Sequence, residues 1–474
     1  MDSGEPWAAG IGADGGRRAR NRRRGPSSET REPAPRADDA EPSAARESRP
    51  RESRDAQGRR DGDRAPRVRP TSHDHLAPAE LVTDDRGLSR LLEHLAGVPE
   101  VAIDTEADSF FSYKERVCLV QVSTPGGDFV VDPLAKLDLE PFGRFLADER
   151  VRKVFHDGEY DVLLFRREHD FAVKNIFDTR VASAALGYET VGLASALERH
   201  FEVKLDKTQQ LSDWSKRPLT DEQIAYARLD THYLLRLAVE LERELDERGR
   251  TEIVAGECRR LEALDTPARE FEPDEFVRLK GARALDLARM QILRELFVAR
   301  DEIARQRNVP PFKVLAHHAL VELARRRPRD LRELEAVPGV GKKLAQRVGR
   351  AMLDAVERGK ELGPLDRIPR LPAKDGTDRL DERGHELHDR LKVVRKKIAE
   401  REGYDASLAL NRLTLLDLAE KAPTRAEDLD GIEGLLDWQV RAFGDEVVDA
   451  IRVFLAEWDA GKVQPRRGQR RRRG

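Results

Sequence analysis

Two carboxylates at the end of a short apolar run have the spacing of metal ligands. Val101, Ala102 and Ile103 lead into Asp104, and Glu106 follows two positions later. Strand side chains alternate with a period of two, so both acids would lie on one side of a buried strand. Neighbouring carboxylates repel each other, and a hard divalent cation with oxygen ligands commonly holds them together. A solvated turn after the strand is the alternative.

A third acid interrupts an apolar helix pattern. In the segment VRKVFHDGEYDVLLF, Asp157 and Gly158 open a helix, and Asp161 stands directly before four apolar residues. A charge among apolar side chains is costly unless it is paired or binds a metal. The alternative is a surface aspartate near a helix N-terminus, where the helix dipole stabilises it. Asp157 is spaced i, i+4 from Asp161 and is a rival ligand.

A tyrosine and a fourth acid share one face of a later helix. Thr220 with Gln223 forms a capping-box pattern that predicts the start of this helix. Tyr226 and Asp230 are spaced i, i+4, so they lie side by side. The aspartate can bind a metal while the phenol orients a metal-bound water. A surface aspartate beside a half-buried tyrosine is the alternative.

Together, and in this order, the three segments resemble the DEDD superfamily of 3′–5′ exonucleases, in the subtype with a tyrosine in the last motif. The segments DTEADSFFSYKERVCLVQVS and LSDWSKRPLTDEQIAYARLD look like the ribonuclease D family within it. The resemblance covers roughly Leu81 to Leu241 and implies a ribonuclease H-like fold. The family pattern has an amide-type residue where this chain has Asp157, which ranks Asp157 second. The resemblance also implies substrate contacts by Trp214 and Arg217; a structural tryptophan and a solvated arginine are the alternative.

The chemistry of the acids agrees with this resemblance. Phosphodiester hydrolysis needs a hydroxide nucleophile, neutralised phosphate charge and a stabilised leaving oxygen, which two cations about 3.5–4 Å apart supply. Two Mg²⁺ or Mn²⁺ ions keep waters and substrate phosphate as further ligands. We expect Tyr226 to orient the attacking water and four acids to bind the ions: Asp104, Glu106, Asp161 and Asp230.

The C-terminal half is a duplicated helical pattern. Two blocks match without gaps at an offset of 95 residues, with Arg300 matching Arg395 and Leu315 matching Leu410. They resemble tandem HRDC domains. The first copy contains a turn like that of a helix-hairpin-helix motif, and its glycines and lysines could contact phosphate: Gly339, Gly341, Lys342 and Lys343. The second copy lacks the second glycine and both lysines, so we expect it to be more structural. Packing of both copies against the catalytic domain is the alternative.

The expected fold is an α/β ribonuclease H-like exonuclease domain, a mixed sheet with flanking helices, followed by two all-α HRDC-type domains. The expected boundaries run in chain order. They are a disordered basic arm over 1–75, the exonuclease domain over 76–250, a connector over 251–272, the first HRDC domain over 273–360, a linker over 361–382, a second HRDC-like domain over 383–460, and a basic disordered tail over 461–474.

Charge and composition bound the class of protein. Residues 1–70 hold 17 Arg against 13 acids, and the tail from Lys462 holds seven basic residues and no acid, although the chain has a net charge of −3. Basic ends on an acidic body indicate arms that hold a polyanion; arginine-rich disorder that only aids solubility is the alternative. The two cysteines fit neither a disulfide framework nor a zinc site. We expect a cytoplasmic monomer without a signal peptide or membrane span.

The sequence therefore predicts a metal-dependent 3′–5′ exoribonuclease. By resemblance it would remove nucleotides as 5′-monophosphates from tRNA precursors and other small structured RNAs. A 3′–5′ DNA exonuclease of the same superfamily stays open, because RNA discrimination depends on contacts to the 2′-hydroxyl. A catalytically inactive nucleic-acid-binding scaffold is the non-enzyme alternative.

Overall fold

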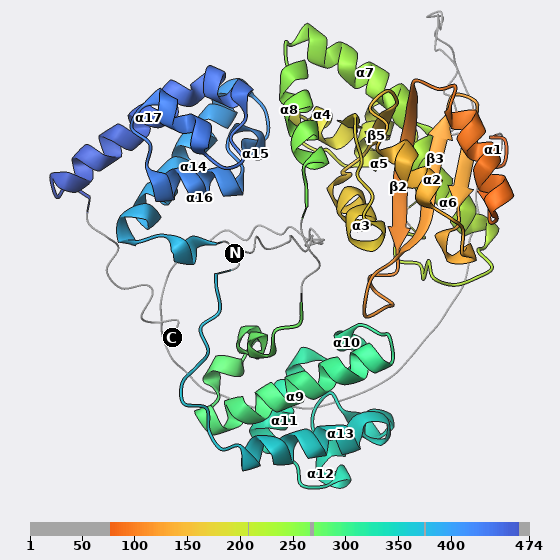
Figure 1. The fold of residues 1–474 in the computed structure, drawn as a ribbon. Coiled ribbons are helices and arrows are strands. Elements are labelled where there is room, and N and C mark those ends of the chain that lie inside the picture. Colours follow the sequence, from red (N-terminus) through yellow and green to blue (C-terminus); the bar gives the residue numbers. More distant parts are fainter. Residues whose placement is uncertain (1–75, 207, 266–269, 374–375, 464–474) are drawn as a thin grey trace, which may run out of the picture. The chain divides into compact units, whose positions relative to one another are not determined.

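The computed structural model of the protein describes residues 76–206, 208–265, 270–373 and 376–463 (Figure 1). The expected basic arm, and the tail beyond residue 463, lie outside the described residues. Within the described ranges an α/β domain is followed by two all-helical domains, as the sequence predicts. None of the helices in these ranges is both long and apolar enough to cross a membrane.

The first domain is built on a six-stranded mixed sheet in the order β1-β4-β3-β2-β5-β6. The β2–β3 and β3–β4 pairs are antiparallel and the other neighbours are parallel. The strands are β1 (Glu80–Val82), β2 (Glu100–Ala107), β3 (Val117–Thr124), β4 (Gly127–Val131), β5 (Arg152–Phe155) and β6 (Ile176–Asp178). β2 contains the predicted buried strand that leads into Asp104 and Glu106. β6 was not predicted.

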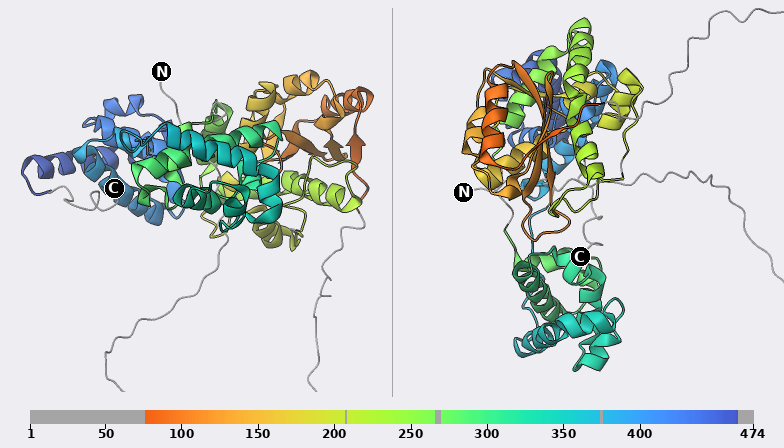
Figure 2. Two further views of the ribbon diagram at one scale, coloured as in Figure 1. Left: turned by 90° about the horizontal axis from the view of Figure 1, so that it is seen from below. Right: turned by 90° about the vertical axis from the view of Figure 1, so that its right-hand side faces the viewer.

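Helices cover both faces of this sheet (Figure 2). Leu119 on β3 packs with Ala227 of α6, and four residues further along β3 the Ser123 hydroxyl lies 2.7 Å from that of Thr231, also on α6. The intervening Val120 and Val122 face the opposite side and join the main core. The helices of this domain are α1 (Asp85–Leu95), α2 (Glu140–Leu146), α3 (Glu159–His169), α4 (Thr179–Ala185), α5 (Leu193–Phe201), α6 (Asp221–His232), α7 (Leu234–Glu247) and α8 (Thr251–Glu262), with the 3₁₀ helix η2 at Pro133–Ala135.

The start of α6 is fixed by a reciprocal capping box, as predicted. The backbone N–H of Gln223 donates to the Thr220 hydroxyl at 3.2 Å, and the backbone N–H of Thr220 donates to the Gln223 side-chain oxygen at 3.0 Å. These two bonds satisfy amides that have no partner within the helix. They also set the rotation of α6, and therefore the direction in which its side chains point.

One buried carboxylate fixes the starts of α3 and α4 together. Asp178, which is 0% exposed, accepts hydrogen bonds from four backbone amides, those of Asp157, Gly158, Arg180 and Val181, at 2.7–3.2 Å. Charge-assisted hydrogen bonds of this kind are stronger than neutral ones. The sequence did not reveal this interaction, because residues 157 and 178 are distant in the chain.

The two helical domains repeat the same order of elements at the predicted offset of 95 residues, with element bounds that agree to within three residues. The first contains α9 (Leu287–Gln306), α10 (Pro311–Val314), α11 (His317–Arg326), α12 (Leu331–Glu335) and α13 (Gly341–Glu361). The second contains α14 (Glu382–Glu402), α15 (Ala406–Ala409), α16 (Arg412–Lys421), η6 (Ala426–Gly431) and α17 (Asp437–Asp459). Shorter 3₁₀ helices are η3 (Pro273–Arg278), η4 (Ala282–Ala284) and η5 (Thr377–Arg379).

The repeat extends to individual contacts. Arg300 donates to the carbonyl oxygen of Leu315 at 3.4 Å, and Arg395 donates to that of Leu410 at the same distance. The glycine of the turn adopts positive φ in both copies, +87° at Gly339 and +72° at Gly434. Matching contacts at matching positions support the duplication that the sequence indicates.

Asp178→Asn is expected to loosen the starts of α3 and α4 together. Asparagine keeps one acceptor oxygen but turns its NH₂ group toward amide donors, so buried N–H groups lose their partner at a cost of about 1–3 kcal/mol. Hydrogen exchange measured by mass spectrometry should speed up in peptides covering 157–161 and 179–183. In the control Asp381→Asn, which alters a carboxylate that accepts from a single backbone amide of α14, those peptides should be unchanged. Unchanged exchange in Asp178→Asn would contradict this account.

Candidate active site

Three elements bring the four predicted carboxylates together. Asp104 and Glu106 end β2 and, with Asp230 of α6, line a cavity of about 330 Å³. Asp161 on α3 is 5% exposed and accepts a hydrogen bond from the hydroxyl of Thr105, the residue between the two β2 acids. β2 and β5 are parallel, and β5 leads directly into α3. The end of β2 and the start of α3 therefore meet at one edge of the sheet.

Burial raises the pKa of every one of these acids, and neighbouring acids of the cluster raise the pKa of Asp104, Glu106 and Asp230 further. The pKa of Glu106 rises to about 9, first through burial and then through Asp230 and Asp161. Burial raises the pKa of Asp161 and of Asp230 to about 7 each, and that of Asp104 well above its usual range. Like charges in a partly buried site disfavour each other's ionisation. Such a cluster is ionised together only when positive charge is supplied.

The donor set fits hard divalent cations. Carboxylate oxygens are the ligands that Mg²⁺ and Mn²⁺ prefer, and no histidine or thiol competes among these four positions. Within the described ranges, no three acidic, histidine or cysteine side chains converge on one point as a complete ion cage. Mg²⁺ does not need one, because it usually keeps several waters and substrate phosphate oxygens as ligands.

Tyr226 lies one helical turn before Asp230 and lines the same cavity. Burial raises the pKa of its phenol, and Asp230, Glu106 and Asp104 raise it further. The phenol therefore stays protonated at neutral pH and is a hydrogen-bond donor. Its ring lies 6.0 Å from that of Trp214, which limits the positions the ring can take.

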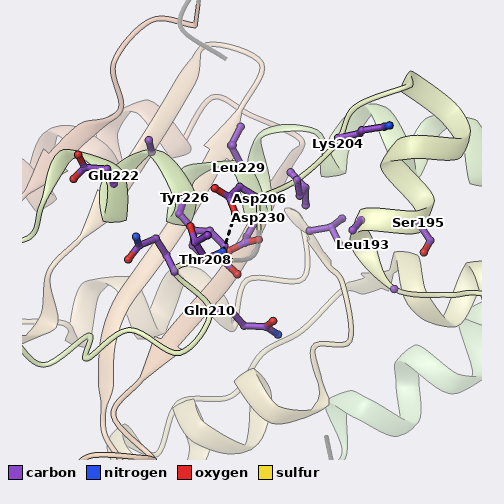
Figure 3. Close-up of a pocket in the computed structure, with 15 residues that line it drawn as sticks. Leu193, Ser195, Lys204, Asp206, Thr208, Gln210, Glu222, Tyr226, Leu229 and Asp230 are labelled. Atoms are coloured by element: carbon purple, nitrogen blue, oxygen red, sulfur yellow. Dashed lines mark hydrogen bonds between the residues drawn. The ribbon is translucent and has the colours of Figure 1, made fainter. Parts of the chain in front are cut away.

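A second and larger cavity adjoins the carboxylates (Figure 3). It measures about 570 Å³ and lies between the start of α5, residues 204–206 and 208–210, and one face of α6. Leu193 and Leu229 give it apolar walls, and Tyr226 and Asp230 line it as well as the first cavity. Its size lies in the range of about 300–1,000 Å³ that small-molecule sites occupy.

Sequence reasoning missed one cation at this site. Arg180, on α4, lines the cavity of the carboxylates, and its Nε lies 3.4 Å from a carboxylate oxygen of Asp157. The rival ligand Asp157 is thus paired with an arginine, and none of the four predicted acids is among the causes that raise its pKa. Asp157 also has φ of +66°, a strained value for a residue other than glycine. Only the fold shows that Arg180 is near, since no motif contains it.

The expected nucleotide contacts by Trp214 and Arg217 do not fit their positions. Trp214 is 1% exposed and packs beside Tyr226 and Ala227. Arg217 donates to both carboxylate oxygens of Asp132 and to the backbone oxygen of Cys118. A buried ring offers no face to a base, and a guanidinium held by several acceptors is not available to a phosphate. Both residues support the segment that leads into α6.

The turn in the first helical domain has the geometry that its glycines suggest. Gly339 and Gly341 have φ of +87° and +62°, and both lie just before or at the start of α13. Lys342 and Lys343 follow in the first turn of that helix and are exposed. Contact of these four residues with nucleic acid stays a prediction.

Comparison with known proteins identifies the family. Residues 79–246 match the 3′–5′ exonuclease family, and residues 289–356 and 385–451 match the HRDC domain. The chain is 31% identical over 373 residues to ribonuclease D of Nitrobacter hamburgensis, covering 77% of this chain and 93% of that protein. The chain belongs to the ribonuclease D family. It is therefore a 3′–5′ exoribonuclease, as the sequence predicts.

Solved structures agree with this assignment. The catalytic core of RRP6 from Trypanosoma brucei is 28% identical, with a TM-score of 0.57, covering 62% of this chain and 82% of that one. Escherichia coli RNase D, described as an exoribonuclease involved in structured RNA processing, shares the fold at 24% identity and a TM-score of 0.57, covering 79% of this chain and 99% of that one. Exonucleases of this superfamily use divalent metal ions, to which the donor set described above is suited.

Asp161→Asn should abolish most of the activity and weaken Mn²⁺ binding, because it removes one ligand charge from the cluster. We expect kcat to fall at least about 100-fold. Substitution of residues that only support metal ligands already lowers metal affinity or activity about 10–100-fold. Calorimetric titration with Mn²⁺ and rates on an RNA oligomer measure both effects. Asp157→Asn is the matched control, and it should change Mn²⁺ affinity little. Equal losses in the two variants would show that the ligand set is wrong.

Proposed function

We propose that this exoribonuclease trims the 3′ ends of tRNA precursors and other small structured RNAs, releasing 5′-monophosphates one at a time. The observation that carries the proposal is the cluster of four carboxylates and Tyr226, with a cavity of about 570 Å³ directly beside it. A single nucleotide fits such a space, and Leu193 and Leu229 would pack against its base or sugar. Removal of one terminal nucleotide at a time follows from a cavity of this size.

Asp104, Glu106, Asp161 and Asp230 would hold two Mg²⁺ or Mn²⁺ ions. Such ions, when bound, neutralise phosphate charge and favour hydroxide formation and departure of the leaving oxygen. The protonated phenol of Tyr226 would donate a hydrogen bond that orients the attacking water. The Thr105 hydroxyl holds Asp161 in place, and the apolar walls of the larger cavity exclude water from around the terminal nucleotide.

Arg180 would bind a phosphate oxygen of the substrate at the rim of the site. It is 43% exposed at the side chain and reaches the cavity of the carboxylates. An arginine fork matches phosphate geometry and forms charge-assisted hydrogen bonds. Its present partner Asp157 is a single carboxylate at 3.4 Å, so exchange for a phosphate costs little.

The first helical domain would add a second RNA contact. Backbone N–H groups near Gly339 and Gly341 can approach a phosphate, and Lys342 and Lys343 add positive charge. We further propose that the protein acts as a monomer in the cytoplasm. Its two cysteines are free and buried, which suits a reducing compartment.

The proposal predicts a ladder of products from a tRNA labelled at its 5′ end and extended at its 3′ end. With Mg²⁺ or Mn²⁺ the label should move through successively shorter species that stop near the mature end, and EDTA should prevent this. A DNA oligomer of matched sequence should be degraded at least about tenfold more slowly, because only RNA offers 2′-hydroxyl contacts. Faster degradation of DNA would favour the DNA exonuclease alternative. An RNA that is bound but not shortened under any metal would favour the inactive scaffold.

Lys342→Glu with Lys343→Glu is expected to weaken RNA binding and lower its salt dependence. Each lost phosphate contact should reduce the slope of log K against log salt concentration by about 1. Lys396→Glu with Lys397→Glu is the matched control, because these are also adjacent exposed lysines on a long helix of an HRDC-type domain. Fluorescence anisotropy of a labelled tRNA measures both. If the two double variants lose equal affinity, the effect is one of net charge and not of the turn.

A further inference from the structure

A buried glutamine next to the carboxylates has no partner for its amide group. Gln121 lies in the middle of β3 and is 0% exposed. Among the described residues, neither its side-chain oxygen Oε1 nor its nitrogen Nε2 finds a hydrogen-bond partner. A buried amide without hydrogen bonds lowers the stability of a fold. Valine or leucine would fill this strand position without that penalty. Packing alone therefore does not explain why a glutamine stands here.

The sheet register places Gln121 directly opposite Asp104. In the antiparallel β2–β3 ladder these two residues are paired, and on the other side Gln121 is paired with Val130 of β4. Directly opposed side chains point to the same face and have their Cβ atoms about 4.5–5.5 Å apart. The nearest polar group across the ladder is therefore the Asp104 carboxylate, whereas Val130 offers nothing to an amide.

The neighbours of Gln121 on β3 show which face this is. Leu119 packs with Ala227 of α6, and the Ser123 hydroxyl lies 2.7 Å from that of Thr231 on the same helix. Gln121 lies between them in the alternation, so it too faces α6. Asp230 comes from this helix. The amide is thus enclosed by the sheet and α6, on the side of the site where Asp104 and Asp230 meet.

We propose that Gln121 is a positioning residue for the metal site: its Nε2 donates a hydrogen bond to one carboxylate oxygen of Asp104 and leaves the other oxygen to a divalent cation. This rests on the proposed function, in which Asp104 is a ligand. Outer hydrogen bonds of this kind orient ligands at many metal sites. A neutral amide suits the position, since a fifth carboxylate would add repulsion and a lysine would compete with the cation.

Gln121→Met tests the proposal, because methionine has a similar length and no hydrogen-bonding group. Calorimetric titration of the full chain with Mn²⁺, without RNA, should give a dissociation constant raised about tenfold. The thermal unfolding midpoint of the metal-free variant should not fall, because an unpartnered buried amide has been removed. Activity at limiting Mn²⁺ should drop and recover as Mn²⁺ is raised. A purely structural glutamine would leave the Mn²⁺ affinity unchanged.

Ser123→Ala is the matched control. It removes a buried polar group from the same strand and face. This hydroxyl bonds Asp128 and Thr231, and neither residue is one of the four acids of the site. It should lower the unfolding midpoint and leave the Mn²⁺ affinity unchanged. Wild-type affinity in Gln121→Met would overturn the proposal, and so would loss of its native fold, because the amide would then stabilise the fold. No Mn²⁺ binding by the wild-type chain would instead overturn the proposed function.

Discussion

Electrostatic repulsion among four carboxylates is the constraint on which the catalytic domain depends. Asp104, Glu106, Asp161 and Asp230 come from a strand and two helices, and the pKa of the first two and of Asp230 is raised by burial and then by neighbouring acids of the cluster. Separate interactions position the two helices that carry these acids. The capping box fixes the start of α6, and the Asp178 carboxylate fixes the start of α3. The Thr105 hydroxyl of β2 bonds Asp161. Repulsion within the cluster raises the free energy of the metal-free fold, and cation binding lowers it again. The fold therefore holds a binding site for positive charge.

Much of the architecture could be predicted because its signals are local. Thr220 and Gln223 mark the start of α6, and the apolar run before Asp104 marks β2. The constant offset of 95 residues revealed the two helical domains, since a duplication needs no knowledge of contacts. The grouping of the four acids came from motif order and family resemblance. Spacing alone left each acid with a surface alternative, and the fold was needed to bring them to one edge of the sheet.

Some residues have roles that the sequence does not reveal, because these roles depend on contacts between residues that are distant in the chain. Trp214 and Arg217 stand in a segment shared with the family, yet burial and the Asp132 carboxylate give them structural roles. Arg180 reaches the site because β6 pairs with β5 and Asp178 joins the starts of α3 and α4. Gln121 reads as an ordinary strand residue until the register pairs it with Asp104. Sequence periodicity shows which side chains share one face of an element, but it does not show which other element packs against that face.

The most direct test is anomalous diffraction from crystals grown with Mn²⁺ and a nucleoside 5′-monophosphate. The account predicts two Mn²⁺ peaks about 3.5–4 Å apart, bound by Asp104, Glu106, Asp161 and Asp230, with the nucleoside in the larger cavity beside Tyr226. The phosphate would lie between the ions and within reach of Arg180. Mn²⁺ bound elsewhere, or none at these four acids with the nucleotide in place, would contradict the central claim that this cluster is the catalytic metal site.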